Sequence, residues 1–389
     1  MLVYIQILRF LAAIAVVAFH AWGVAPNYVA VPDDAASFGL WHGGHGVDLF
    51  FVISGFIIFY ATQDSGQSPA AFLRRRVERI VPLYTVVIVA VTGLALLWPA
   101  VFGAPDWYTP RHILKSLMYV SFTDGEMPVV YVGWSLEYEM YFYLVVGLLM
   151  ALATQVWRSV VMLFSVVVIA GQLAGVATAL GNCAFFVNPL LLELVVGVVV
   201  GHIFVKGRPD WLMIAAVACA FAAVLAADPF NRAVVCGIPA ACLVAGGAYL
   251  SRRRTSPSWS ERALARLGDA SYSIYLAQVQ TVSFTCLLVA SLVPAIPPLL
   301  LVFAVCCVVV LFGLLINVAI ERPLLSLCRR VGRPGTGVVD QKFAPSFPRV
   351  HRANFLSIDD TRIMDLPVSF SNPKKARQTA GQPPNKLEC

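Results

Sequence analysis

The chain has 389 residues, of which 59% are hydrophobic and only 13% charged, and its formal net charge is +7. This composition excludes an ordinary soluble domain, because the apolar residues occur in runs of about 20, long enough to cross a bilayer as helices. The positive charge is concentrated on one side of these runs. We therefore expect it to reflect membrane topology and anionic lipid headgroups, and we expect no nucleic-acid partner.

Ten apolar runs predict an all-α integral membrane protein, a bundle of about ten transmembrane helices. The runs cover 2–25, 43–62, 80–101, 131–153, 158–179, 183–205, 210–227, 231–250, 270–293 and 296–319. The gaps after even-numbered runs, with the segment after the last run, carry fifteen Lys and Arg residues, whereas the opposite gaps carry three. This bias predicts that both termini are cytoplasmic. The first run carries two ionisable residues and precedes nine further spans, so it is not expected to be a cleaved signal peptide.

Residues 331–389 differ abruptly from the rest of the chain. They are rich in Gly, Pro, Ser, Asn and mixed charges and show no apolar periodicity. The sequence therefore predicts a transmembrane domain over 1–330 followed by a largely disordered cytoplasmic tail over 331–389. The nine cysteines lie mainly inside predicted spans without metal-ligand spacing, and we interpret them as packing residues.

Arg9 and His20 stand eleven residues apart in the first run. Eleven residues make three helical turns plus roughly 20°, so the two side chains share one face and lie about 16 Å apart along the axis. Ionisable groups inside a membrane usually face the protein interior or a water-filled path. Arg suits an anion such as phosphate, and His suits proton transfer near neutral pH. This helix thus offers an anion clamp and a candidate base.

The second run is preceded by the segment His42-Gly43-Gly44-His45-Gly46-Val47-Asp48. Two histidines followed by Asp48 suggest a metal site, but the glycines argue against a preformed helical site, and no third His or Cys is near in sequence. No metal is therefore expected. A flexible turn is one alternative. We favour another, in which the glycines let the backbone approach a ligand beside Asp48.

Arg76 and Arg79 are three residues apart at the start of the third run and share a helix face. Composition alone favours a topogenic cluster that reaches the headgroups. The functional alternative is a docking site for a phosphorylated cytosolic ligand.

The fourth run opens with Trp134-Ser135-Leu136-Glu137-Tyr138-Glu139, followed by further aromatic residues that include Tyr143. Glu137 and Glu139 point to different helix faces, so at most one of them faces a given pocket. Glu139 lies deeper and is the stronger candidate. The aromatic residues are typical of an interface belt or of a surface that packs on a sugar ring. Glu193 in the sixth run is another buried acid, whose partner the sequence does not identify.

The ninth run begins Asp269-Ala270-Ser271-Tyr272-Ser273-Ile274-Tyr275, which reads as a helix start followed by interfacial tyrosines. The tenth run ends at Glu321-Arg322-Pro323, where proline is expected to stop the helix at the cytoplasmic surface.

Taken in order, these segments resemble the acyltransferase 3 family of integral membrane acyltransferases over about residues 5–325. The motif around Trp134 to Met140 looks most like the exopolysaccharide-production branch, whose members O-acetylate bacterial polysaccharides. The pieces that match the family are Arg9 with ten residues and then His20, Gly46 to Phe56, Arg76-x-x-Arg79 with Pro82, Trp134-Ser135-Leu136-x-x-Glu139-x-x-Phe142-Tyr143, Ser271 to Leu276, and Glu321-Arg322-Pro323.

The resemblance implies a multi-pass enzyme of the bacterial inner membrane that takes an acetyl group from cytosolic acetyl-CoA. It implies no permanently bound cofactor, and the acceptor is a sugar hydroxyl that is either polymeric or lipid-linked. Acetyl and succinyl donors both occur in the family. The residues that it assigns, together with those that the patterns above single out, are Arg9, His20 and Glu139 for catalysis, Arg76 and Arg79 for the donor, and Asp48, Trp134, Ser135, Tyr143 and Tyr272 for substrate.

We expect direct transfer with His20 as general base, and an acyl-histidine relay is the alternative. One departure from the family concerns Gln278, which stands where members often carry His. A proton-transfer role is therefore excluded there, but hydrogen bonding is retained. A transporter of a polysaccharide or lipid-linked sugar, without acyl chemistry, is the second functional class. It is disfavoured because we see no inverted repeat and because transport gives Arg76 and Arg79 no obvious role.

Overall fold

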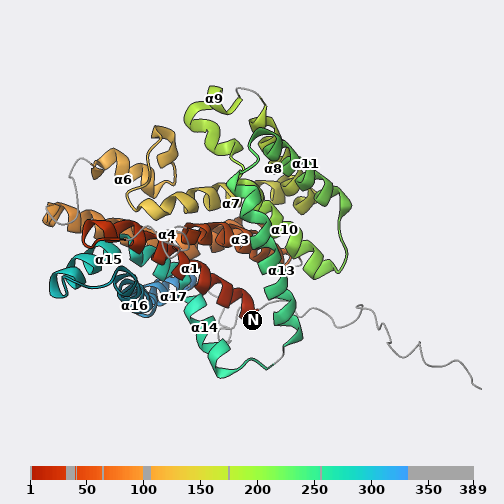
Figure 1. Ribbon diagram of the computed structural model, residues 1–389. Coiled ribbons are helices and arrows are strands. Elements are labelled where there is room, and N and C mark those ends of the chain that lie inside the picture. The colour runs from red at the N-terminus through yellow and green to blue at the C-terminus, as the bar shows by residue number, and fades with distance from the viewer. Residues whose placement is uncertain are drawn as a thin grey trace, which may run out of the picture. The chain divides into compact units, whose positions relative to one another are not determined.

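The computed structural model describes residues 2–31, 40, 42–63, 65–99, 107–173, 176–254 and 256–331, and within these ranges every regular element is helical (Figure 1). Apart from Val331, the predicted tail lies outside the described residues. The longer helices are α1 (Val3–Val24), α3 (Gly46–Thr62), α4 (Pro69–Leu97), α7 (Trp134–Leu152), α8 (Val156–Gln172), α10 (Leu191–Lys206), α11 (Trp211–Ala227), α13 (Gly237–Arg253), α15 (Ser271–Leu292) and α16 (Pro298–Ile316).

Shorter helices connect them. The α-helices among these are α6 (Pro110–Leu117), α9 (Val176–Leu180), α12 (Arg232–Val235), α14 (Trp259–Asp269) and α17 (Arg322–Val331). The 3-10 helices are η1 (Ala25–Asn27), η2 (His42–His45), η4 (Ser121–Asp124), η5 (Tyr131–Gly133) and η6 (Gly181–Val187), and η7 (Asn317–Glu321) is a π-helix.

The chain is a multi-pass helical membrane protein. In its described part, eight helical segments are long and apolar enough to cross a membrane. The other two of the ten predicted spans correspond to α8 and α11, which are apolar helices of 17 residues each. About 17 residues is the lower limit for a transmembrane helix. Ten crossings therefore remain a prediction, whereas the helical membrane architecture is established.

The two predicted boundaries that are displaced most are the starts of α4 and α10. α4 begins at Pro69, eleven residues before the predicted run, because Ser68 caps the helix by accepting a hydrogen bond from Ala71 N at 3.2 Å. The arginine cluster is consequently helical, although its charges hide it from a search for apolar runs. α10 begins at Leu191, later than predicted, because Asn188 and Pro189 separate it from the 3-10 helix η6.

α1 contacts helices from both halves of the chain: α3, α13, α14, α15 and α16 (Figure 1). The most extensive helix pairing in the described residues joins α3 to α10. There the backbones touch, since a Cβ added at Gly55 would lie 1.9 Å from the Leu194 oxygen, and one added at Gly197 would lie 2.1 Å from the Val52 oxygen. Small residues permit such close approach between membrane helices. This pairing fixes α3, which forms a wall of the candidate site.

Candidate active site

A cavity of about 230 Å³ lies among α1, α3, α4, α7 and α15. Its lining comes from segments that are far apart in the sequence. Seven of the ten predicted site residues line it: Arg9, Arg76, Arg79, Ser135, Glu139, Tyr143 and Tyr272. The remaining three predicted residues, His20, Asp48 and Trp134, are not part of the lining.

The arginines of α4 divide into two groups. Arg76 and Arg79 line the cavity, whereas Arg74 and Arg75 are exposed. The Arg76 guanidinium lies over the rings of Phe72 and Tyr143, with centroid distances of 5.6 and 6.0 Å. Within the described part of the chain, Arg76 Nε has no hydrogen-bond partner. A buried donor without a partner is costly, so Arg76 is suited to an incoming anion.

Arg79 is held by Glu321, with which it forms an ion pair. The same carboxylate accepts hydrogen bonds from Ser273 Oγ at 2.5 Å and from Asn317 Nδ2 at 2.7 Å. Glu321 is the last residue of the π-helical turn η7, and such turns are frequent at functional sites. Sequence reasoning placed Glu321 only at a helix end. Its role as the anchor of Arg79 depends on the packing of α16 and η7 against α4 and α15.

Glu139 is the carboxylate in the cavity lining. Tyr143 donates its hydroxyl hydrogen to Glu139 Oε2 at 2.8 Å, and Ser54 Oγ lies 3.0 Å from the same hydroxyl. Arg9 contributes a third guanidinium and donates to Gln6 Oε1 at 3.2 Å. Three guanidiniums thus face a single carboxylate across the lining, so the cavity carries net positive charge and suits an anionic ligand.

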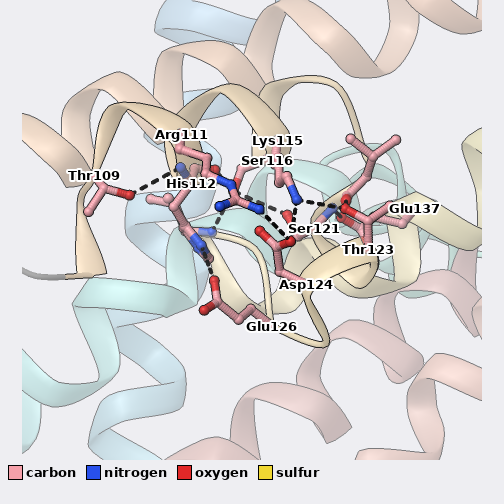
Figure 2. A network of polar contacts seen from close by, with 12 residues as sticks. Thr109, Arg111, His112, Lys115, Ser116, Ser121, Thr123, Asp124, Glu126 and Glu137 are labelled. Atoms are coloured by element: carbon pink, nitrogen blue, oxygen red, sulfur yellow. Dashed lines mark hydrogen bonds and ion pairs between the residues drawn. The ribbon is translucent and has the colours of Figure 1, made fainter. Parts of the chain in front are cut away.

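Glu137, two residues earlier, faces a different part of the fold, as its spacing from Glu139 predicts. Its Oε1 accepts a hydrogen bond from Ser121 N at 2.8 Å, which ties η4 to the first turn of α7 (Figure 2). In the same network Asp124 Oδ1 forms ion pairs with Lys115 Nζ at 2.5 Å and with Arg111 Nη2 at 2.9 Å. The hydrogen bond from Lys115, supported by the charge of Arg111, lowers the pKa of Asp124. The segment from α6 to η4 is therefore a structural support for α7.

His20 lies outside the cavity lining, on the same helix as Arg9. Its Nδ1 is 2.9 Å from Gln278 Oε1, and Gln278 Nε2 donates to the Tyr275 oxygen at 2.8 Å. Because the amide N–H is engaged by that carbonyl, the amide oxygen faces His20 and must accept its hydrogen bond. Nδ1 of the neutral ring therefore carries the proton, and Nε2 keeps its lone pair. The ring also makes an edge contact with Tyr131 at 5.1 Å.

Tyr275 connects His20 to the cavity. Its backbone oxygen holds Gln278, and its side chain lines the cavity, with the hydroxyl 2.8 Å from the Val132 oxygen and 2.9 Å from Ser135 Oγ. His20 is thus linked through Gln278 to a residue of the cavity wall. Sequence reasoning interpreted Tyr275 as an interfacial anchor. The buried position of its ring, at 5% exposure, corrects that interpretation.

Asp48 and Trp134 meet at a second place, around Arg232. Asp48 is 1% exposed and accepts hydrogen bonds from Arg232, from Nε to Oδ1 at 2.8 Å and to Oδ2 at 3.2 Å, and from Nη2 to Oδ2 at 2.9 Å. The same guanidinium lies 6.0 Å from the Trp134 ring. Sequence reasoning missed this partner, because 184 residues separate Arg232 from Asp48 and nothing in the sequence pairs them.

Two of the glycines before Asp48 bring the backbone close to α1. A Cβ at Gly43 would lie 2.4 Å from the Ala15 oxygen, and a Cβ at Gly46 would lie 2.4 Å from the Ala12 oxygen. The segment His42–His45, for which a flexible turn was the alternative interpretation, forms the 3-10 helix η2, which leads directly into α3. Helix packing accounts for these two glycines.

Comparison with known proteins supports an acyl-transfer site. The sequence model of the acyltransferase 3 family, described as an acyltransferase domain, matches residues 2–318. The exopolysaccharide production protein ExoZ of Rhizobium meliloti (strain 1021) is 35% identical over 298 residues, which cover 73% of this chain and 90% of that protein. The acyltransferase MdmB of Streptomyces mycarofaciens is 27% identical over 310 residues, covering 71% and 78% of the two chains. No solved structure matches.

Proposed function

Because the chain belongs to the acyltransferase 3 family, we propose that it moves an acetyl group from cytosolic acetyl-CoA to a sugar hydroxyl of a bacterial exopolysaccharide or its lipid-linked precursor. The observation that carries this proposal is the cavity in which Arg9, Arg76 and Arg79 converge. Arg9 lies on α1, the helix that also bears His20. The printed name of ExoZ supports a saccharide acceptor.

The arginines are suited to the donor. CoA carries phosphates, and a guanidinium binds phosphate through two parallel hydrogen bonds. The cavity, at about 230 Å³, is smaller than the roughly 300–1,000 Å³ typical of small-molecule pockets. It therefore suits one part of the donor, with the remainder extending toward the cytosol. The excess of Lys and Arg on one side of the spans supports cytoplasmic termini and donor entry from that side in the bacterial inner membrane.

His20 is the proposed general base. Its Nε2 lone pair takes the proton of the sugar hydroxyl while the hydroxyl oxygen attacks the thioester carbonyl carbon. The carbon–sulfur bond then breaks, CoA leaves, and the imidazolium returns the proton to the sulfur. Gln278 supports this step because its oxygen keeps the proton on Nδ1 and so leaves Nε2 free to accept one. Holding donor and acceptor in one site supplies the remainder of the rate enhancement.

The test compares the ester content of the surface polysaccharide in a deletion strain, in its parent, and in the strain complemented with wild type or with His20→Ala. We expect loss of acetyl ester on deletion, its return with wild type, and no return with the variant. Labelled acetyl-CoA supplied to isolated membranes then identifies the donor, and succinyl-CoA is the competing candidate. Unchanged ester content with impaired polysaccharide export would contradict acyl transfer and favour the transporter.

A further inference from the structure

A group of metal-ligating side chains gathers where η2, α3 and the start of α13 meet, apart from the cavity. His45 Nδ1 lies 3.3 Å from Asp48 Oδ2 and 3.2 Å from Cys236 Sγ. The three ligand atoms all lie within 4.8 Å of one another. We call these residues, together with Glu193 of α10, the His45–Cys236 cluster. No member of it lines the arginine cavity.

The buried side chain of Glu193 is a second, independent indication of a bound cation. Its side chain is fully buried, and in the described part of the chain neither carboxylate oxygen accepts a hydrogen bond. Its electrostatic neighbours are Asp48, Arg232 and Cys236, so its carboxyl group faces the cluster. Gly237 makes room for it, since a Cβ there would lie 3.0 Å from Glu193 Cγ. Two acidic side chains, Glu193 and Asp48, are therefore buried next to each other, which is costly when both are ionised, and a cation between them removes that cost.

The two separations measured from His45 Nδ1 are compatible with tetrahedral zinc. Bonds of about 2.0–2.1 Å to nitrogen and oxygen and about 2.3 Å to sulfur place ligand atoms roughly 3.3–3.6 Å apart. The observed separations of 3.3 Å for nitrogen to oxygen and 3.2 Å for nitrogen to sulfur are close to these values. A mixed set of imidazole, thiolate and carboxylate favours zinc over calcium or magnesium, which prefer oxygen alone.

The charges also balance. With Cys236 as a thiolate, the cluster carries three negative charges, on Cys236, Asp48 and Glu193, whereas Zn²⁺ and Arg232 together carry three positive ones. Without the metal, Arg232 compensates only the carboxylate that it binds. Arg232 also donates to the Gly44 oxygen at 3.2 Å, so it orients Asp48 from outside the ligand set, as the partners of metal-binding carboxylates commonly do.

We propose that His45 Nδ1, Asp48 and Cys236 bind one Zn²⁺ ion, and that the Glu193 carboxyl group, on binding, completes the site as its fourth ligand. Four protein ligands leave no open position, so the site is structural. It cross-links η2 and α3 to α10 and to the start of α13. Sequence reasoning disfavoured a metal because it found no third ligand near His45 and Asp48. The fold supplies Cys236 as a third ligand, and it brings the Glu193 carboxyl group to Asp48 and Cys236.

Zinc content is the direct test. The full-length protein, purified in detergent from cells grown with zinc, is expected to contain about one zinc per chain. Cys236→Ala and Glu193→Gln are expected to weaken Zn²⁺ binding by at least about tenfold. Cys286→Ala is the control, because Cys286 is a buried cysteine on α15, outside the cluster, and the zinc content of this variant should equal that of wild type.

A second measurement needs no variant. Wild-type protein stripped with a chelator and given Co²⁺ should show a thiolate-to-cobalt charge-transfer band together with the ligand-field bands of tetrahedral cobalt. Zn²⁺ should then displace the cobalt and abolish both. Folded wild-type protein with far less than one zinc per chain and no thiolate–cobalt band would overturn the proposal. A band that persists undiminished in folded Cys236→Ala would also overturn it.

Discussion

His20 Nδ1 and Gln278 Oε1 are 2.9 Å apart, and this contact determines which nitrogen of the imidazole can act as a base. The glutamine is itself fixed by its bond to the Tyr275 oxygen. A residue that cannot transfer a proton in acid–base catalysis thereby sets the protonation pattern of one that can. The proposed roles of His20 as base and of Gln278 as the residue that orients it can therefore be tested by separate substitutions.

Replacing His20 with Ala should abolish measurable acyl transfer, because a general base contributes roughly 10²–10⁴-fold to rate. Expression and membrane insertion should be unchanged, since alanine is cheaper to bury in a membrane than imidazole. The measurement is the rate of label transfer from acetyl-CoA in membranes that contain matched amounts of protein. A variant with near-parental activity would remove His20 from the mechanism.

Gln278→Leu should lower kcat by roughly tenfold or more while leaving the KM for acetyl-CoA unchanged, since the lost group orients the base and does not touch the donor. Gln278→His, which can still accept the Nδ1 proton, should recover most of the rate. If Gln278→Leu raised KM and left kcat unaltered, Gln278 would belong to donor binding and not to positioning.

Changing Arg76 and Arg79 together to Lys should weaken acetyl-CoA binding by roughly tenfold, because lysine keeps the charge but loses the two-pronged geometry. The same double change at Arg74 and Arg75, which are exposed on the same helix, is the control and should leave binding unaltered. Topology reporters should give the same orientation for both, since the positive charge is preserved. Equal affinity for acetyl-CoA in the two double variants would mean that Arg76 and Arg79 only set membrane topology and do not bind the donor.

Gly197→Ala should destabilise the protein by about 1–3 kcal/mol, because the new methyl group would press on the Val52 oxygen of α3. Gly246→Ala, where an added Cβ meets nothing within 4 Å, should instead stabilise α13 by roughly 0.5–1 kcal/mol. Thermal unfolding in one detergent compares the two. Similar shifts for both would mean that α3 and α10 do not pack as closely as described.

The segment from α6 to η4 should loosen in acid. Because Lys115 lowers the pKa of Asp124, ionised Asp124 contributes stability above its unfolded-state pKa, and that contribution is lost as the pH falls through the lowered folded-state value. Hydrogen exchange at residues 110–124 should accelerate in that pH range. Asp124→Asn should already show fast exchange at neutral pH and lose the pH dependence. If both proteins behaved alike, Asp124 would not hold this segment.

Apolar runs and shared motifs predicted much of this fold but only part of its polar organisation. Each predicted run corresponds to an apolar helix, because the bilayer demands about 20 apolar residues per span. Family resemblance and helix faces were enough to predict Arg9, Arg76 and Glu139 as site residues. The start of α4 could not be predicted in this way, because its charged turns interrupt the apolar pattern without interrupting the helix.

Other partners depend on tertiary packing alone. Arg232 reaches Asp48, and Glu321 reaches Arg79, across 184 and 242 residues of chain. Local periodicity does not predict such pairings. A single basic residue at the edge of an apolar run, such as Arg232, is interpreted from sequence as a charge that sets membrane topology. Glu193 was recognisable as a costly buried acid. Its neighbours became identifiable only when α10 was packed against α3 and α13.

In the proposed mechanism, the offset between Arg9 and His20 along α1 sets the distance that the donor must span. Eleven residues place Arg9, the proposed phosphate-binding residue, about 16 Å from His20, the proposed base. A donor must therefore carry its acyl carbon on a long arm beyond its phosphates, as the pantetheine chain of CoA does. Acetyl phosphate, whose acyl group is bonded directly to phosphate, should occupy the arginines without presenting its carbonyl to His20. We expect it to compete with acetyl-CoA and to donate nothing, so the spacing itself selects a class of donor.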